Sequence, residues 1–95
     1  MDRRGTDFEW DENKRLSNIQ KHGIDFVRAL DAFWDPQSFE YRSRADHEEQ
    51  RCVLVGKADG RLLAVIYVTR GLRIRIISAR LARREERKLW NENTS

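Results

Sequence analysis

Arginine alternates with isoleucine in residues 70–80, where the chain reads RGLRIRIISAR. Successive side chains of a β-strand point to opposite faces of its sheet, so Arg73 and Arg75 share one face and the isoleucines between them the other. Arginine stays charged in proteins and can bind two phosphate oxygens at once. A strand that buries its isoleucines and displays these guanidinium groups predicts a phosphate-binding surface. RNA or DNA is therefore the first partner to consider.

The end of this strand leaves two alternatives open. If side chains alternate regularly, Arg80 points to the opposite face of the sheet from Arg75. It then reaches the phosphate surface only if the strand twists or bulges. The alternative is that Arg80 pairs with Glu86 and fixes the next helix. Ser78 shares the isoleucine face and is expected to be a small core residue. Tyr67 and Thr69 share one face of the preceding strand and are candidates to line the cleft beside the arginines. For Tyr67, a place in the core is an equal alternative.

A basic helix is predicted over residues 82–92, directly after the strand. Its cations are Arg83, Arg84, Arg87 and Lys88. Together with Arg70 and Arg80 they are candidate RNA-binding residues. A solvated helix stabilised by its own glutamates explains them equally well, and a protein interface is a third alternative.

Lys21 and His22 are expected in the last turn of a helix that Asp11 caps and Gly23 ends. Histidine exchanges protons near neutral pH, so it can act in acid–base catalysis. Cations at a helix C-terminus also interact favourably with the helix dipole, which gives the pair a purely structural alternative. His47, in a polar loop at 43–49, is a weaker candidate because such loops are commonly just solvated.

The 95 residues fit one domain, expected over 7–95, with 1–6 as a flexible tail. Hydrophobic residues make up 39% of the chain, enough for a small core. Charge is unevenly placed: residues 1–69 carry 11 Lys and Arg against 13 Asp and Glu, whereas residues 70–95 carry 8 against 3. This asymmetry indicates a basic patch with an acidic complement elsewhere.

Several classes of protein are disfavoured. The single cysteine, Cys52, has no partner for an internal disulfide, which favours a reducing compartment. One cysteine and two histidines without tight spacing make a structural zinc site improbable, so we expect no metal and no cofactor. No apolar run is long enough to cross a membrane, and the N-terminus lacks a signal-peptide pattern. These features predict a cytoplasmic protein without membrane partners.

The predicted elements give an α+β fold. Strands are expected at 8–10, 38–42, 51–56, 61–69 and 72–79, and helices at 12–22, after Asp25 as far as Asp35-Pro36, and at 82–92. Asp59-Gly60 is a strong hairpin signal. Phe26, Phe33 and Trp34 are expected in the core. The order predicts an antiparallel β-sheet packed with two N-terminal helices and one C-terminal helix.

An ordered set of motifs runs through the chain: Phe8-Glu-Trp-Asp11, Asn18, Lys21-His-Gly23, Phe26, Phe33, Asp35-Pro36, Gly56 and Arg73-Ile-Arg-Ile-Ile-Ser-Ala-Arg80. Over residues 8 to about 92 this pattern resembles the BrnT family, ribonuclease toxins of bacterial type II toxin–antitoxin systems with a RelE-like fold. Relatives commonly have threonine where this chain has Arg83, so a capping hydroxyl is missing. The glutamate and the aromatic residue that follow are present as Glu86 and Trp90.

The resemblance implies a metal-independent endoribonuclease that cleaves RNA and inhibits translation. It also implies a cognate antitoxin, expected to carry a ribbon-helix-helix DNA-binding domain, so that DNA is contacted only through the antitoxin. In this reading Arg75 and Arg73 hold the phosphate, and His22 and Lys21 are candidates for proton transfer or backbone binding. The products would be 2′,3′-cyclic phosphate and 5′-hydroxyl ends. The alternative is a non-catalytic nucleic-acid- or partner-binding module of the same fold.

Overall fold

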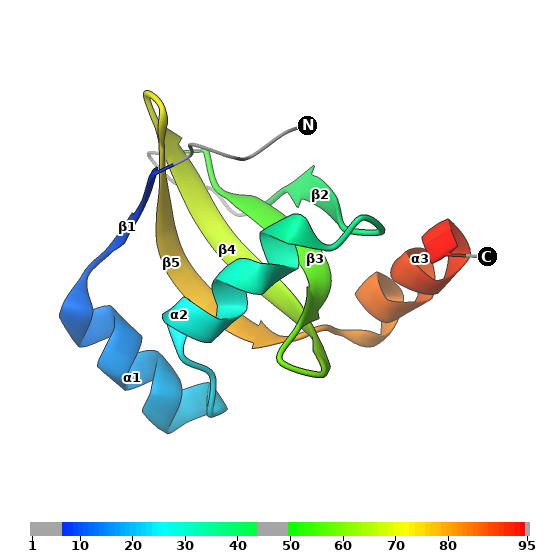
Figure 1. The fold of residues 1–95 in the computed structure, drawn as a ribbon, viewed down its shortest axis with the longest axis horizontal. Coiled ribbons are helices and arrows are strands. Elements are labelled where there is room, and N and C mark those ends of the chain that lie inside the picture. Colours follow the sequence, from blue (N-terminus) through cyan, green and yellow to red (C-terminus); the bar gives the residue numbers. More distant parts are fainter. Residues whose placement is uncertain (1–6, 44–49, 95) are drawn as a thin grey trace.

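The computed structural model describes residues 7–43 and 50–94 (Figure 1). Residues 1–6, predicted as a tail, and His47 lie outside the described residues. The described elements follow the predicted order: β1 (Asp7–Trp10), α1 (Glu12–His22), α2 (Phe26–Ala29), the 3-10 helix η1 (Leu30–Trp34), β2 (Phe39–Arg42), β3 (Cys52–Ala58), β4 (Arg61–Arg70), β5 (Arg73–Leu81) and α3 (Arg84–Thr94).

The strands form one five-stranded sheet in the order β1-β5-β4-β3-β2. Strands β2 to β5 pair antiparallel with their neighbours in the chain, as predicted, but β1 runs parallel to β5. The sheet is therefore mostly antiparallel, as predicted, and departs from the prediction only at the parallel pairing of β1 with β5. The turn between β3 and β4 has positive φ angles at both Asp59 (53°) and Gly60 (75°), the geometry of a type I′ hairpin.

The two faces of the sheet are covered differently. On the helix face, α2 and η1 pack against buried side chains of the central strands, including Leu63, Val65 and Ile76. The opposite face has a smaller cluster built on Val53, Val55, Leu62 and Ala64, against which Trp90 of α3 packs. Figure 1 accordingly shows α3 at the end of the sheet away from α1.

The second predicted helix is divided in two. Asp25 caps it as expected, accepting a hydrogen bond from the Val27 amide at 3.0 Å, but the chain is α-helical only to Ala29. Phe26, Ala29 and Ala32 are fully buried at a spacing of three, which suits the three residues per turn of a 3-10 helix. This tighter winding leaves Trp34 51% exposed, so its assignment to the core was wrong, whereas Phe33 is buried.

Candidate nucleic-acid interface

A β-bulge decides which residues of β5 share a face. Tyr67 of β4 pairs with Ile76, whereas the preceding Ile66 pairs with Ser78, so Ile77 is an extra residue without an opposite partner. The alternation of side chains is shifted by one after this point. Residues that pair across a sheet lie on the same face, so Arg80, opposite Ala64, shares the face of Arg73 and Arg75. We call this side of the sheet the arginine face.

Arg73 and Arg75 are accessible on this face. Arg73 is exposed, and among the described residues it makes no ion pair. Arg75 is paired with the neighbouring strand, where its Nη1 lies 3.2 Å from Oε2 of Glu9 and its side chain is 28% exposed. That contact uses one of the five N–H donors of a guanidinium group, which leaves capacity for a phosphate. No helix seals these two arginines from solvent, although Arg75 is partly neutralised.

Arg80 has a different environment. It lies on the arginine face and also pairs with Glu86, so both alternatives considered for it are correct. The bulge turns it to the arginine face, and there it forms a bidentate ion pair with Glu86, with Nη1–Oε1 at 2.7 Å and Nη2–Oε2 at 3.0 Å. Tyr41 of β2 donates its hydroxyl to the same carboxylate. The positive charge of Arg80 is therefore already compensated by Glu86, which argues against a direct contact of Arg80 with RNA phosphate.

Glu86 holds this cluster together. It is 4% exposed, and burial alone would raise its pKa. Hydrogen bonds from Arg80, the backbone N–H of Arg83 and the hydroxyl of Tyr41 outweigh burial and lower the pKa of Glu86 to about 2. The 2.7 Å bond from the Arg83 amide is the glutamate half of a capping box, which survives although the usual capping hydroxyl is absent.

A second polar contact fixes α3, and the sequence did not reveal it. The indole N–H of Trp90 donates to Oδ2 of Asp35 at 2.9 Å, and the same oxygen accepts the Lys57 amide at 2.7 Å. The Lys57 ammonium also lies 5.4 Å from the centre of the Trp90 ring. From the sequence, Asp35-Pro36 is interpreted only as a helix stop. It also ties α3 to β3.

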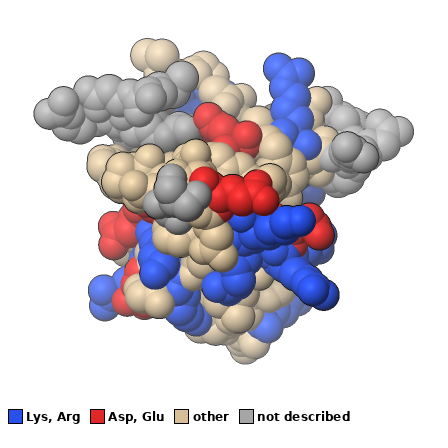
Figure 2. All heavy atoms as spheres, turned by 90° about the vertical axis from the view of Figure 1, so that its right-hand side faces the viewer, with Lys and Arg blue, Asp and Glu red and all other residues tan. Residues whose placement is uncertain are grey.

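The remaining predicted RNA-binding residues are on the surface. Arg83, Arg84, Arg87 and Lys88 are exposed on or just before α3. A shallow hollow of about 390 Å³ on α3 is lined partly by Arg84, Arg87 and Lys88. Figure 2 shows the side of the molecule that carries α3, where Lys and Arg gather over the lower half. Arg70 is exposed at the end of β4, directly opposite Arg73 in the hairpin.

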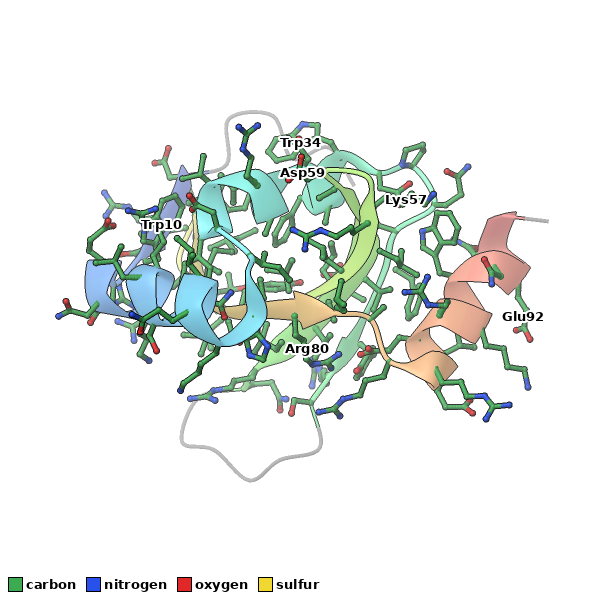
Figure 3. All side chains as sticks on the ribbon, turned by 90° about the horizontal axis from the view of Figure 1, so that it is seen from below. Trp10, Trp34, Lys57, Asp59, Arg80 and Glu92 are labelled. Atoms are coloured by element: carbon green, nitrogen blue, oxygen red, sulfur yellow. The ribbon has the colours of Figure 1, made fainter. Side chains whose placement is uncertain are left out.

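Lys21 and His22 lie apart from this helix, in the exposed last turn of α1, which ends at Gly23 as predicted. They line a groove of about 260 Å³ between α1 and β5 together with Lys14, Ser17, Asn18, Ile77 and Ser78. The groove contains neither Arg73 nor Arg75, but Ser78 follows them on β5 and lies at its wall. Figures 1 and 3 show α1 running beside the second half of β5.

Asn18 joins the two walls of this groove. It is 5% exposed, and its amide donates at 2.9 Å to the carbonyl oxygens of Ile24 and Ala79. Its Oδ1 accepts from the Ala79 amide at 3.1 Å and from the Ser78 hydroxyl at 3.2 Å. The side chain of Asn18 thus makes the hydrogen bonds to the edge of β5 that a neighbouring strand would make, at the point where β1 has ended. The sequence signal for this role of Asn18 is its place in the middle of a helix, where asparagine has poor helix propensity.

Three expectations about neighbouring residues change. Ser78 is half-buried beside the groove and not in the core, because the bulge reverses its parity. Tyr67 is 4% exposed and packs in the core of the helix face, at 5.4 Å from the ring of Phe33. Thr69 pairs with Ile74 and so also faces away from the arginines. These two residues do not line the arginine face.

No helix among the described residues, 7–43 and 50–94, is long and apolar enough to span a membrane. No group of three or more His, Cys, Asp or Glu side chains among them could hold a metal ion.

The comparisons with known proteins agree with the motifs. A family model described as ribonuclease toxin, BrnT, of type II toxin–antitoxin system matches residues 10–86, which include α1, the arginines of β5 and Glu86. No curated protein matches the chain significantly. Because the family match covers most of the sequence, the chain belongs to the BrnT family of ribonuclease toxins of type II toxin–antitoxin systems.

Proposed function

We propose that this chain is an endoribonuclease that cleaves RNA without a metal ion, inhibits translation in the bacterial cytoplasm and is neutralised by a cognate antitoxin. The observation that carries the proposal is the arginine face, where Arg73 is exposed and Arg75, paired among the described residues with Glu9 alone, keeps donors for a phosphate. Family membership supplies the ribonuclease class. The α+β sheet with its N-terminal helices is compatible with a RelE-like fold.

The chemistry needs cations more than any other group. When the ribose 2′-hydroxyl attacks the adjacent phosphorus, negative charge accumulates on the phosphorane oxygens. Arg75 and Arg73 neighbour each other along one strand face and would stabilise that charge together. Removing one such preorganised donor typically reduces the rate about 10²–10³-fold. Glu9 would orient Arg75 through their ion pair.

Proton transfer requires further groups. His22 and Lys21 are the candidates, either for deprotonating the 2′-hydroxyl and protonating the leaving 5′-oxygen or for binding the RNA backbone. Their groove meets β5 at Ser78, so RNA on the arginine face would pass close to them. The products would be 2′,3′-cyclic phosphate and 5′-hydroxyl ends.

The basic surface of α3 is proposed to bind RNA, and it is also suited to the antitoxin. Arg84, Arg87 and Lys88 line one hollow together with Glu92, so the hollow carries a net positive charge. An acidic segment of an antitoxin would compete there with RNA. The antitoxin is expected to be of the ribbon-helix-helix type, so that operator DNA is bound by the antitoxin and not by this chain.

The test is cleavage of single-stranded RNA by the purified chain in excess EDTA, with the product ends identified. Arg75→Ala is expected to reduce the rate about 10²–10³-fold while the protein still folds and co-purifies with its antitoxin. Arg28→Ala, an exposed arginine on α2, is the matched control and should cleave normally. RNA binding without cleavage would favour the non-catalytic module. Cleavage that EDTA abolishes would refute a metal-free mechanism.

A further inference from the structure

We propose that the groove between α1 and the bulge of β5 binds a backbone phosphate of the RNA strand, on a nucleotide neighbouring the one that is cleaved. This inference rests on the proposed function, because it takes RNA as the ligand. It assigns a role to Lys14 and Ser17, which were not among the predicted site residues. Lys14 and Ser17 would hold the strand in place and would not take part in bond cleavage.

The charges and donors of the groove suit a phosphate. Lys14, Ser17 and Lys21 are three and four residues apart on α1, so their side chains project from one side of the helix. Both lysines are exposed, and Ser17 is half-buried between them. Among the described residues that line the groove, none is acidic. The two ammonium groups are therefore not compensated inside the groove.

The groove is held in a fixed shape by buried hydrogen bonds. Asn18 lies at its base and links α1 to the backbone of Ala79 through both its amide nitrogen and its oxygen. The Ser78 hydroxyl donates its hydrogen bond to Oδ1 of Asn18, so Ser78 shapes the wall of the groove and does not supply a donor to a ligand. A preformed site binds its ligand with a smaller ordering cost, which suits a positioning role.

The dimensions suit a small unit of the RNA strand. A volume of about 260 Å³ lies below the roughly 300–1,000 Å³ of pockets that enclose drug-sized molecules. A phosphate with part of its sugar fits, and the methyl groups of Ile77 offer an apolar wall to the sugar. A longer segment of nucleic acid would have to lie across the groove and not inside it.

The position of the groove connects it to the arginine face. Ser78 is three residues after Arg75 on β5, which corresponds to roughly 10 Å at 3.3 Å per residue. At Ser78, β1 no longer covers the edge of β5, because the pairing of the two strands ends at Trp10 and Ile76. A strand with its scissile phosphate at Arg75 could therefore cross this edge and place a neighbouring phosphate between Lys14 and Lys21.

The test uses a 12-nucleotide single-stranded 2′-O-methyl RNA, which lacks the attacking hydroxyl and remains intact. Its affinity is measured by fluorescence anisotropy over a series of salt concentrations. We expect Lys14→Gln to reduce the slope of log affinity against log salt by about 0.7, the value for one lost phosphate contact on a single strand. Arg28→Gln removes the same charge from α2 and should leave the slope unchanged. With cleavable RNA, Lys14→Gln should raise KM and leave kcat unaltered.

The outcomes separate the groove from the proposed function. If the wild-type chain cleaves RNA while Lys14→Gln and Arg28→Gln give identical slopes and KM values, the groove proposal is overturned and the nuclease remains. If Lys14→Gln alone reduces the slope but no RNA is cleaved, the groove binds RNA and the nuclease proposal fails. A loss of kcat in Lys14→Gln would also contradict the inference, because it would place Lys14 in the reaction itself.

Discussion

Replacing Asn18 with aspartate tests the link between α1 and β5 with almost no change of shape. The asparagine amide group donates two hydrogen bonds of 2.9 Å, to the carbonyl oxygens of Ile24 and Ala79. A carboxylate oxygen at that position would face two carbonyl oxygens and could donate to neither. Ile24 and Ala79 are both 0% exposed, so water cannot replace the lost donors.

The expected loss of stability follows from those contacts. A buried polar group without a partner costs about 1–3 kcal/mol, so two orphaned carbonyls correspond to roughly 2–6 kcal/mol before the burial of the new charge is counted. Typical domains are stable by only about 5–15 kcal/mol. Asn18→Asp should therefore remove a large part of the free energy of unfolding at pH 7, although its Oδ1 can still accept the hydrogen bond from the Ala79 amide.

The effect should depend on pH in a defined direction. Burial and the facing carbonyls raise the folded-state pKa of the introduced carboxyl above its unfolded value of about 3.9. The penalty is then complete above the folded-state pKa and decreases as the pH falls, because the protonated acid can donate one hydrogen bond again. The difference in unfolding free energy between the variant and the wild type should shrink between pH 7 and pH 4.

Urea unfolding followed by tryptophan fluorescence measures this difference. Asn13→Asp is the matched control, since it makes the same chemical change on the exposed side of α1 and in its first turn, where a negative charge is favourable. A cost below about 1 kcal/mol for Asn18→Asp at pH 7 would refute the assignment of Asn18 as a buried bridge. So would a cost that does not change with pH.

Two further predictions concern the packing of β3 and the start of α3. Gly56→Ala should destabilise the fold by about 1–3 kcal/mol in urea unfolding, because a Cβ there would lie 2.5 Å from the backbone oxygen of Ala32; unchanged stability would contradict this close approach. Glu86 has a pKa of about 2 against an ordinary 4.5, so its stabilisation of about 3 kcal/mol is present above pH 5 and is lost as the pH falls towards 2. Glu86→Gln should remove this part of the pH dependence relative to wild type, and parallel pH profiles would refute it.

Local signals in the sequence predicted most of the fold. The caps at Asp11 and Asp25 and the Asp59-Gly60 turn depend on a few adjacent residues, and each has the expected geometry. The four antiparallel strands follow one another in the chain, so hairpin rules were sufficient. The direction of β1 was not predictable in this way. A four-residue strand has no feature that distinguishes parallel from antiparallel pairing.

The candidate site was only partly predictable, because its decisive contacts join distant residues. Glu9 and Arg75 are 66 positions apart and meet only because β1 joins the edge of β5. Asn18 and Ala79 are 61 positions apart. By contrast, the pairing of Arg80 with Glu86 spans six positions and was among the alternatives that the sequence offered. Sequence patterns identify residue types along one element, whereas these pairs depend on where the elements meet.

The bulge at Ile77 accounts for the part of the site that follows Arg73 and Arg75 along β5. In a regular strand, Arg80 would point to the helix face, into the core position that Ala79 occupies with 0% exposure. A buried guanidinium there would be strongly unfavourable. One extra residue places Ala79 in the core and Arg80, which is labelled in Figure 3, on the arginine face. There Arg80 forms its ion pair with Glu86 and thereby fixes the start of α3. The same irregularity turns Ile77 and Ser78 towards α1 and forms the wall of the groove. The position of Arg80 on the arginine face and the wall of the groove both follow from this single inserted position in β5, whereas Arg73 and Arg75 lie before it.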